Sequence, residues 1–211
     1  MAIVVAFVSQ KGGVGKSTLA RAMAREAAAG GLKVKIADLD VQQGTSVDWN
    51  RQRLAAGIEP MISVESFATA AQALAGANGH DILIIDGPAR TSRGTLEIAN
   101  ASNLVVQPTG ASLDDLRPAV REFHALMKAD IPQTRLVFAL NRIGTSNEET
   151  ESRNYLEEAG YSVLDGCLVE RPGYRQAQNS GYAITETRYS ALNSRADILV
   201  QSLIDLVTKN G

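Results

Sequence analysis

The pattern of apolar and polar positions predicts strands and helices that alternate along the chain. Short runs rich in β-branched apolar residues predict strands at Ile3–Ser9, Lys33–Asp38, Met61–Glu65, Asp81–Asp86, Asn103–Gln107 and Leu136–Asn141. Longer stretches with apolar residues at helical spacing predict helices at Lys16–Ala29, Thr45–Ala56, Phe67–Ala77, Gly94–Ala101, Leu113–Lys128, Asn147–Ala159, Arg175–Ser180 and Ser190–Thr208. This alternation is typical of an α/β protein, so we expect a doubly wound, mostly parallel sheet with helices on both faces.

Length and composition agree with a single domain that spans residues 1–211. Apolar residues make up 45% of the chain and charged residues 21%, as in ordinary globular domains, and no long linker or repeat divides it. The net charge of −2 excludes a protein that is basic all over, and the single cysteine excludes an internal disulfide. No stretch approaches the ~20 consecutive apolar residues of a membrane span, so we expect a cytoplasmic protein.

Polar residues follow the carboxyl ends of five predicted strands. They are the segment 10–18, then Asp38 and Asp40, Asp86, Gln107, and Asn141. In open parallel sheets, ligands bind beyond these ends, where the loops of neighbouring strands meet. The sequence therefore predicts one ligand site on this edge, lined by a lysine, carboxylates and amides.

The first of these loops has the sequence Lys-Gly-Gly-Val-Gly-Lys-Ser from residue 11 to residue 17. Glycines let successive backbone N–H groups turn inward toward phosphate oxygens, and a helix that starts near Lys16 adds its positive end. Lys16 would reach the β- and γ-phosphates, and the Ser17 hydroxyl would bind Mg²⁺. The usual phosphate-loop pattern has glycine at the position of Gln10, and this chain carries a second lysine, Lys11, beside it. Chance would produce such a loop in a chain of this size with odds on the order of 10⁻⁴.

This loop resembles the deviant Walker A loop of the ParA/MinD ATPases. Residues 38–42, Asp-Leu-Asp-Val-Gln, resemble the D-x-D-P-Q segment of that family, and Ile82–Asp86 resembles its Walker B strand. The segment 40–49 is most similar to that of the small ParA proteins that partition plasmids. These small forms lack an N-terminal DNA-binding domain. Val41 replaces the proline that the family prefers, and residues 86–89 carry one proline where two are usual.

The resemblance implies an ATPase that uses ATP and Mg²⁺. The nucleotide-binding residues would be Lys11, Gly12, Gly13, Val14, Gly15, Lys16, Ser17, Thr18 and Asn141, and the metal-site residues Ser17, Asp38 and Asp86. Asp86 would hold Mg²⁺ through a water, and Asp40 would orient the attacking water. Asp38 could instead cap a turn, and Asn141 could be a turn residue rather than an adenine contact.

Lys11 is not needed to hold phosphates within its own subunit. In the family, the matching lysine crosses a two-fold interface and touches the ATP of the partner. The resemblance therefore implies an ATP-dependent homodimer that hydrolysis dissolves, with Lys11, Lys16 and Asp40 as the catalytic set.

Four arginines lie in a locally basic segment near the C-terminus: Arg171, Arg175, Arg188 and Arg195. On one face of a dimer they would bind DNA phosphates without reading sequence, although ordinary solvated arginines remain an alternative. Arg51 and Arg53 lie on a predicted helix and are expected to face solvent. The last predicted helix is amphipathic with little basic charge, so we expect it to pack on the core rather than on a membrane.

Together with the family resemblance, these features favour a DNA-segregation ATPase that acts on a plasmid or chromosome. Its partners would be a second copy, nonspecific DNA and a small ParB-type centromere-binding protein, and the ATP-bound form would associate with the nucleoid. Alternatives are a MinD-like membrane-associated regulator, a transfer-DNA accessory ATPase of the same fold, and an ATP-dependent ligase or kinase.

Overall fold

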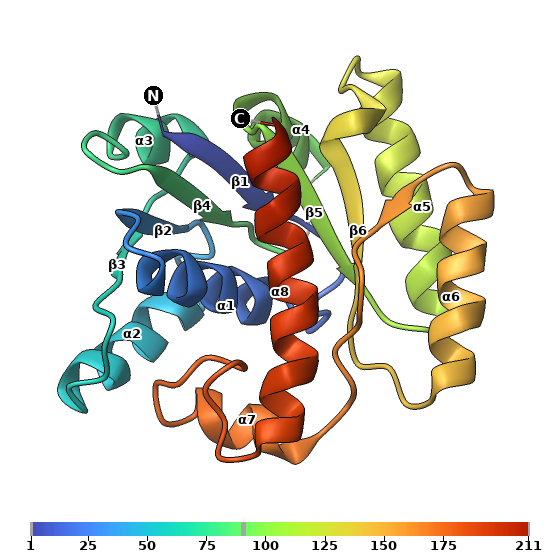
Figure 1. Cartoon of the computed structure of the whole chain (residues 1–211). Helices are drawn as coiled ribbons and strands as arrows, with labels where there is room; N and C mark the ends of the chain where they lie inside the picture. The colour runs from blue at the N-terminus through green and yellow to red at the C-terminus, as the bar shows by residue number, and fades with distance from the viewer. Residues whose placement is uncertain (1, 90–91, 211) are drawn as a thin grey trace.

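The computed structural model describes residues 2–89 and 92–210. Over these residues a seven-stranded parallel sheet has the order β3-β2-β4-β1-β5-β6-β7 (Figure 1). Its strands are β1 (Ile3–Phe7), β2 (Val34–Asp38), β3 (Ser63–Ser66), β4 (Ile82–Asp86), β5 (Leu104–Thr109), β6 (Leu136–Leu140) and β7 (Ser162–Val163). The predicted fold class, an α/β protein with a parallel sheet, is confirmed.

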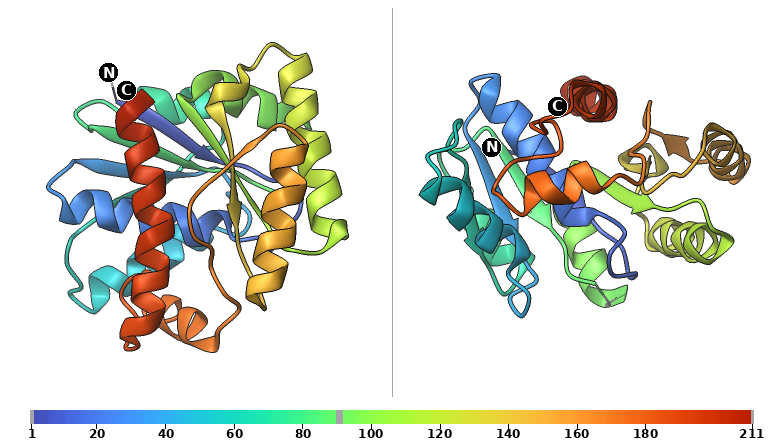
Figure 2. Two further views of the ribbon diagram at one scale, coloured as in Figure 1. Left: turned by 45° about the vertical axis from the view of Figure 1, so that its right-hand side comes forward. Right: turned by 90° about the horizontal axis from the view of Figure 1, so that it is seen from below.

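Helices cover both faces of the sheet, as the two views of Figure 2 show. Their bounds are α1 (Lys16–Ala29), α2 (Thr45–Ala55), α3 (Ala70–Ala75), α4 (Ser92–Ala101), α5 (Leu113–Lys128), α6 (Ser146–Glu158), α7 (Pro172–Gln178) and α8 (Ser190–Asn210), with a short 3₁₀ helix at Gln133–Arg135. Val5 and Phe7 of β1 pack with α1 and α8, whereas Val4 and Ala6 pack with α4 and α5. Because both faces are buried, the central strands β1 and β4 read as continuous apolar runs, whereas the edge strand β3 is largely exposed and polar.

Several boundaries differ from the sequence prediction, and each has a local reason. The edge strand β7 is absent from the predicted strands. It has only two residues, too few to carry a pattern of apolar and polar positions. α7 begins at Pro172, three residues early, because proline fits the first turn of a helix. β5 runs through Pro108 to Thr109, because β6 pairs with it as far as Thr109, and β1 pairs only with Leu104–Val106 and so needs no N–H from Pro108.

The apolar face of α8 packs into the core, as predicted. Leu199, Leu203 and Val207 are at most 4% exposed, although Ile198 is 55% exposed. Within residues 2–89 and 92–210, no helix combines the length and the apolar character needed to cross a membrane.

Candidate functional site

The loop between β1 and α1 requires glycine for two physical reasons. Gly13 and Gly15 have φ values of +74° and +108°, in the left-handed region that side chains disfavour. A Cβ at Gly15 would also overlap the amide of Asn141. Gly15 is the N-cap residue of α1 and provides no side-chain cap. The first turn of α1 therefore offers backbone N–H groups at the loop, an arrangement suited to phosphate.

Lys16 lies at the start of α1 and is only 8% exposed. Its ammonium group reaches back over the loop to 3.5 Å from the backbone oxygen of Lys11. Burial lowers the pKa of Lys16, whereas the charges of Asp86, Asp40 and Glu122 raise it. The lysine is thus a buried cation whose charge is stabilised by three carboxylates from separate parts of the chain.

Asp38, at the end of β2, anchors the start of α2. Its buried carboxylate accepts hydrogen bonds from the backbone N–H groups of Ser46 at 2.9 Å, Asp40 at 3.1 Å and Val47 at 3.4 Å. Burial raises the pKa of Asp38, and these N–H groups oppose the rise. The capping alternative therefore describes Asp38 in this structure, and its role toward Mg²⁺ stays a prediction.

Asp86 ends β4 and is 2% exposed. Its Oδ2 accepts a hydrogen bond of 2.7 Å from the Ser46 hydroxyl, while its Oδ1 is buried without a partner among the described residues. Burial raises the pKa of Asp86 to about 6, although the hydroxyls of Ser46 and Ser17 oppose this. The unpartnered oxygen fits a water-mediated contact to Mg²⁺.

The donor set limits what cation could bind here. Over the part of the chain that the structure describes, no group of three or more His, Cys, Asp and Glu side chains could hold a metal ion alone. Mg²⁺ is suited to such a place because it usually keeps several waters and shares its remaining ligands with substrate phosphates. The Ser17 hydroxyl, 3.2 Å from the Thr45 hydroxyl, could serve as the protein ligand of such a Mg²⁺ ion.

Asp40 stands in a tight turn after β2 and is partly buried. Its backbone oxygen accepts hydrogen bonds from Gly44 at 2.7 Å and Gln43 at 3.1 Å, and its Oδ1 accepts one from Gln43 at 3.3 Å. Its charge raises the pKa of Lys16, so both side chains act on the same site. Its role toward an attacking water stays a prediction.

Lys11 is tied to its own chain. Its side chain is 48% exposed and forms an ion pair with Asp115 of α5, and its Nζ also lies 3.4 Å from the backbone oxygen of Asp114. Burial would raise the pKa of Asp115, but hydrogen bonds from Lys11 and Ser112 outweigh it and lower this pKa. Exposed pairs contribute little free energy, about 0–1 kcal/mol, so Lys11 can exchange Asp115 for another anion.

Asn141 clamps the phosphate loop from the end of β6. Its side-chain amide donates to the backbone oxygen of Val14, and its Oδ1 accepts from Arg142 N at 2.9 Å. It also borders a cavity of about 230 Å³ beside the loop, together with Gly13, Gly15, Thr18, Tyr174 and other residues. An adenine contact would use the cavity side of this amide and stays a prediction.

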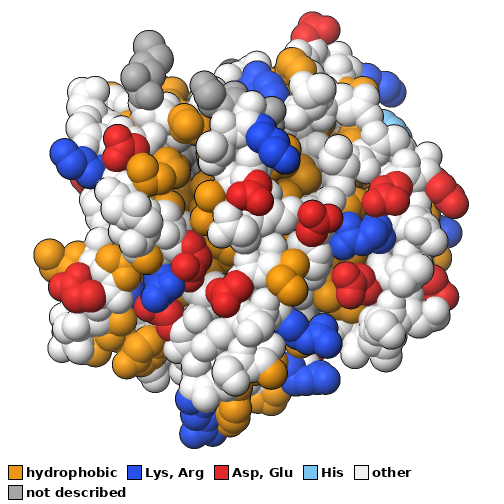
Figure 3. Space-filling model, in the orientation of Figure 1, with side chains coloured by type: hydrophobic (Ala, Val, Ile, Leu, Met, Phe, Trp, Pro, Cys, Tyr) orange, Lys and Arg blue, Asp and Glu red, His pale blue; other side chains and the backbone are white. Residues whose placement is uncertain are grey.

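The four predicted DNA-binding arginines fall into two groups. Arg171 and Arg175 border the cavity beside the phosphate loop, and Arg175 forms a 3.0 Å ion pair with Glu170. Arg188 stacks on Tyr189, and Arg195 is exposed on α8. Figure 3 shows Lys and Arg side chains gathered at the lower end of this face, below a region of Asp and Glu. The DNA-binding role of these arginines stays a prediction.

Sequence reasoning missed a buried polar chain that leads away from Asp86. The Ser46 hydroxyl accepts a hydrogen bond of 3.2 Å from Arg21 Nε, and Arg21 Nη1 lies 3.4 Å from Gln178 Oε1 on α7. Arg21 is 8% exposed and lies over the Trp49 ring, 5.5 Å from its centroid. The sequence contains a signal for the position of Arg21. Arg21 follows Ser17 by four residues, so the two side chains lie on the same face of α1.

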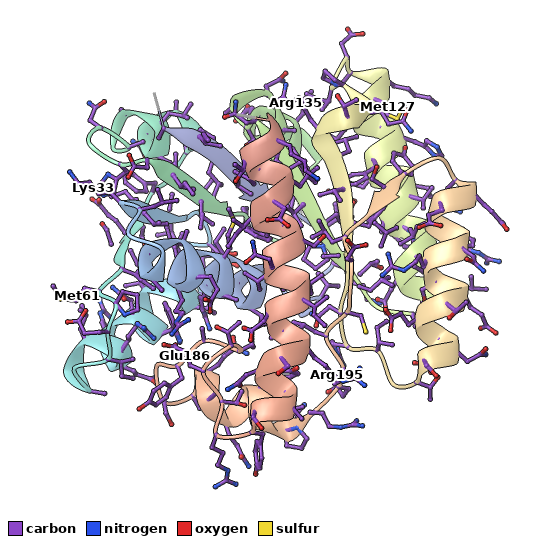
Figure 4. All side chains as sticks on the ribbon, in the orientation of Figure 1. Lys33, Met61, Met127, Arg135, Glu186 and Arg195 are labelled. Atoms are coloured by element: carbon purple, nitrogen blue, oxygen red, sulfur yellow. The ribbon has the colours of Figure 1, made fainter. Side chains whose placement is uncertain are left out.

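The expectation that Arg53 faces solvent is wrong. Its side chain is fully buried and donates to Glu186 at 2.7 Å and to the backbone oxygens of Glu59, Pro60 and Gly181. Figure 4 labels Glu186 on the segment between α7 and α8, beside α2. Arg53 follows Trp49 by four residues, so it lies on the buried face of α2, whereas Arg51 is exposed as expected.

Together these features define a phosphate-loop nucleotide-binding protein. They are a glycine-rich loop between a strand and a helix, a buried lysine, a neighbouring serine and two strand-end carboxylates. The family model of the CobQ/CobB/MinD/ParA nucleotide-binding domain matches residues 5–184. The chain belongs to this family.

Relatives and solved structures agree with this assignment. The chain is 24% identical over 186 residues to the maintenance of carboxysome distribution protein A of Gloeobacter kilaueensis, covering 88% of this chain and 85% of that protein. The septum site-determining protein MinD of Pyrococcus horikoshii with Mg-ADP superposes with a TM-score of 0.77 at 16% identity, over 100% of this chain and 99% of that one. A Borrelia burgdorferi protein, provisionally described as a plasmid partition protein and bound to AMPPNP, gives 0.72 at 13% identity over 100% of both chains. At these identities, the structural matches show the fold.

Proposed function

We propose that this chain is a Mg²⁺-dependent ATPase, one domain over residues 1–211, that dimerises with ATP and binds DNA nonspecifically to segregate a plasmid or chromosome. The observation that carries the proposal is the pairing of two lysines in one loop. Lys16 is buried, whereas Lys11 is half-exposed and held by an ion pair with Asp115 and a 3.4 Å contact to the backbone oxygen of Asp114. This contrast supports a role for Lys16 in binding phosphates within its own chain and a role for Lys11 in reaching a second subunit.

The loop, the strand-end carboxylates and Asn141 would each have a role in nucleotide binding and hydrolysis. The loop N–H groups and Lys16 hold the phosphates, and Ser17 with the water-mediated Asp86 holds Mg²⁺, with Asp38 behind them. Bound Mg²⁺ supplies charge neutralisation at the terminal phosphates. Asp40 orients the water for hydrolysis, and Asn141 supports both the loop and the adenine.

Lys11 joins two subunits. When it exchanges Asp115 for the phosphates of the partner subunit's ATP, the nucleotide becomes part of the dimer interface. Because hydrolysis removes the terminal phosphate, it weakens this contact and releases the subunits.

DNA binding would follow from dimerisation. One chain has a net charge of −2, but a dimer that aligns Arg171, Arg175, Arg188 and Arg195 of both subunits presents a basic face to phosphates. The protein would act in the cytoplasm, on the nucleoid when ATP-bound, with a small ParB-type protein that resets it. A transfer-DNA role of the same kind uses the same residues.

A MinD-like membrane-associated regulator is the second candidate, because the MinD structure above shares the fold. Such a regulator needs an apolar surface for lipid. The apolar face of α8 is used by the core, with Leu199, Leu203 and Val207 buried, so this helix does not supply one. This observation favours the DNA-segregation proposal.

Light scattering of two variants tests the roles of Lys11 and Asp40. Lys11→Ala should bind ATP and stay monomeric, because the link between subunits is lost. Asp40→Ala should dimerise with ATP and remain dimeric, because hydrolysis fails. If the two variants behave identically, at least one assignment is wrong.

Gel shifts on unrelated DNA fragments test the proposed binding to nonspecific DNA. Binding should need a slowly hydrolysed ATP analogue, weaken steeply with salt and hardly depend on sequence, because phosphate contacts release counterions. Charge reversal at Arg195 should weaken it without changing ATP affinity. Binding to liposomes but not to DNA would instead support the membrane regulator.

A further inference from the structure

Glu122 is a buried carboxylate beside the phosphate loop that none of the roles above uses. It lies on α5 between Ala119 and Leu126, on the face of the helix that packs on the sheet, and is 6% exposed. A charged side chain among apolar neighbours is costly unless it is hydrogen-bonded or paired. Its partners therefore indicate what it is for.

Three elements donate hydrogen bonds to this carboxylate. Gln10 N at 3.2 Å belongs to the phosphate loop, Gln107 Nε2 at 2.7 Å to β5, and the Thr95 hydroxyl at 3.3 Å to α4. Gln10 is the first residue of the loop, at the position where the usual pattern has glycine. Glu122 thus fastens the entrance of the loop to two neighbouring elements.

The charge of Glu122 also acts on Lys16. Over the described residues Glu122 forms no ion pair within 4 Å, but each group shifts the pKa of the other, because Glu122 raises that of Lys16 and Lys16 lowers that of Glu122. Burial nevertheless raises the pKa of Glu122 overall. Its negative charge is therefore only partly compensated within the chain.

We infer that Glu122 is a positioning residue that holds the phosphate loop and limits its affinity for nucleotide. Without nucleotide, its carboxylate is a counter-charge for Lys16 and an anchor for Gln10 N. Nucleotide phosphates bring further negative charge to the same lysine, so Glu122 opposes their binding. This inference rests on the nucleotide site proposed above.

Glu122→Gln tests the inference because the amide keeps the shape and an acceptor oxygen but removes the charge. Affinity for Mg-ADP, measured by calorimetry, should rise at least roughly threefold, because a negative charge that opposes the phosphates is removed. The gain should be larger for a slowly hydrolysed ATP analogue, which carries more negative charge. A residue that served stability alone would not raise affinity when altered.

Glu186→Gln is the matched control, because Glu186 is another largely buried carboxylate but lies outside the site. It should lower stability and leave the affinity for Mg-ADP unchanged. Glu122→Ala, which also removes the anchor for Gln10, should gain less affinity than Glu122→Gln.

Unchanged or weaker nucleotide binding by folded Glu122→Gln would overturn the inference. The substitution removes a buried charge that is incompletely compensated, so the inference predicts that Glu122→Gln folds. Failure of this variant to fold would therefore also overturn the inference. If the wild type itself bound no Mg-ADP, the proposed nucleotide site would fail instead. Binding by the wild type that Lys16→Ala abolishes, together with no gain in Glu122→Gln, would refute only the role of Glu122.

Discussion

Two sets of buried charges in this protein have opposite electrostatic character. Around the phosphate loop, burial raises the pKa of Asp38, Asp86 and Glu122. In the second set, Glu186 lies between Arg53 and Arg25. Burial alone would raise the pKa of Glu186, but hydrogen bonds from Arg53 and Ala183 N and the two arginine charges outweigh it and lower this pKa.

The difference separates structural from functional use of charge. The Glu186 set is complete within the chain, because every charge has a close partner of opposite sign. The phosphate-loop set is incomplete, and one oxygen of Asp86 has no partner in the described chain. Strongly shifted pKa values with unmet partners are typical of sites whose ligand completes the interactions.

The largest expected effect is on the complete set. Arg53→Met should lower the free energy of unfolding by about 3–5 kcal/mol, because it leaves Glu186 buried without its main partner. Urea denaturation measures this. Arg51→Met is the control: its ion pair with Asp48 is exposed, and the loss should stay below about 0.5 kcal/mol. Equal losses in the two variants would refute the comparison.

Lys16→Ala should next show the incomplete set as functional. We expect at least about 100-fold weaker binding of Mg-ADP, equivalent to about 2.7 kcal/mol, because the buried cation of the phosphate loop itself is removed. Stability should fall little. Calorimetry and denaturation of the same variant check both outcomes, and near-normal affinity would contradict the assignment of the loop.

Acid should weaken the Glu186 set. Because the folded pKa of Glu186 lies below its ordinary value of 4.5, its contribution to stability is present above pH 4.5 and is lost as the pH falls through the folded pKa. The stability difference between wild type and Glu186→Gln should therefore be largest near pH 7 and shrink below pH 4.5. A difference that does not change with pH would mean that charge is unimportant there.

The smallest expected effect is at Lys11. Asp115→Asn should change stability by less than about 1 kcal/mol, because the pair is partly exposed to water. Denaturation measures this change. A larger loss would mean that Lys11 is held as firmly as Arg53, which would contradict its proposed exchange between subunits.

Two arginines of α2 show why the sequence predicted the fold better than it predicted the environment of charged side chains. Strand and helix positions follow from local periodicity, and the phosphate loop from glycine and lysine spacing. Arg51 and Arg53 have the same local chemistry, yet one is exposed and the other is fully buried. The difference arises because Glu186, 133 residues away, packs against one face of α2.

The sequence by itself determined the parallel sheet, the phosphate loop and the strand ends that carry Asp38, Asp86 and Asn141, because each depends on neighbouring residues. Only the tertiary structure decided that Asn141 binds the loop, that Glu122 accepts a hydrogen bond from Gln10 N and that Arg171 lines the cavity beside the phosphate loop. Burial and hydrogen bonding join residues from distant parts of the chain. Their effect on charge appears only when the elements have packed together.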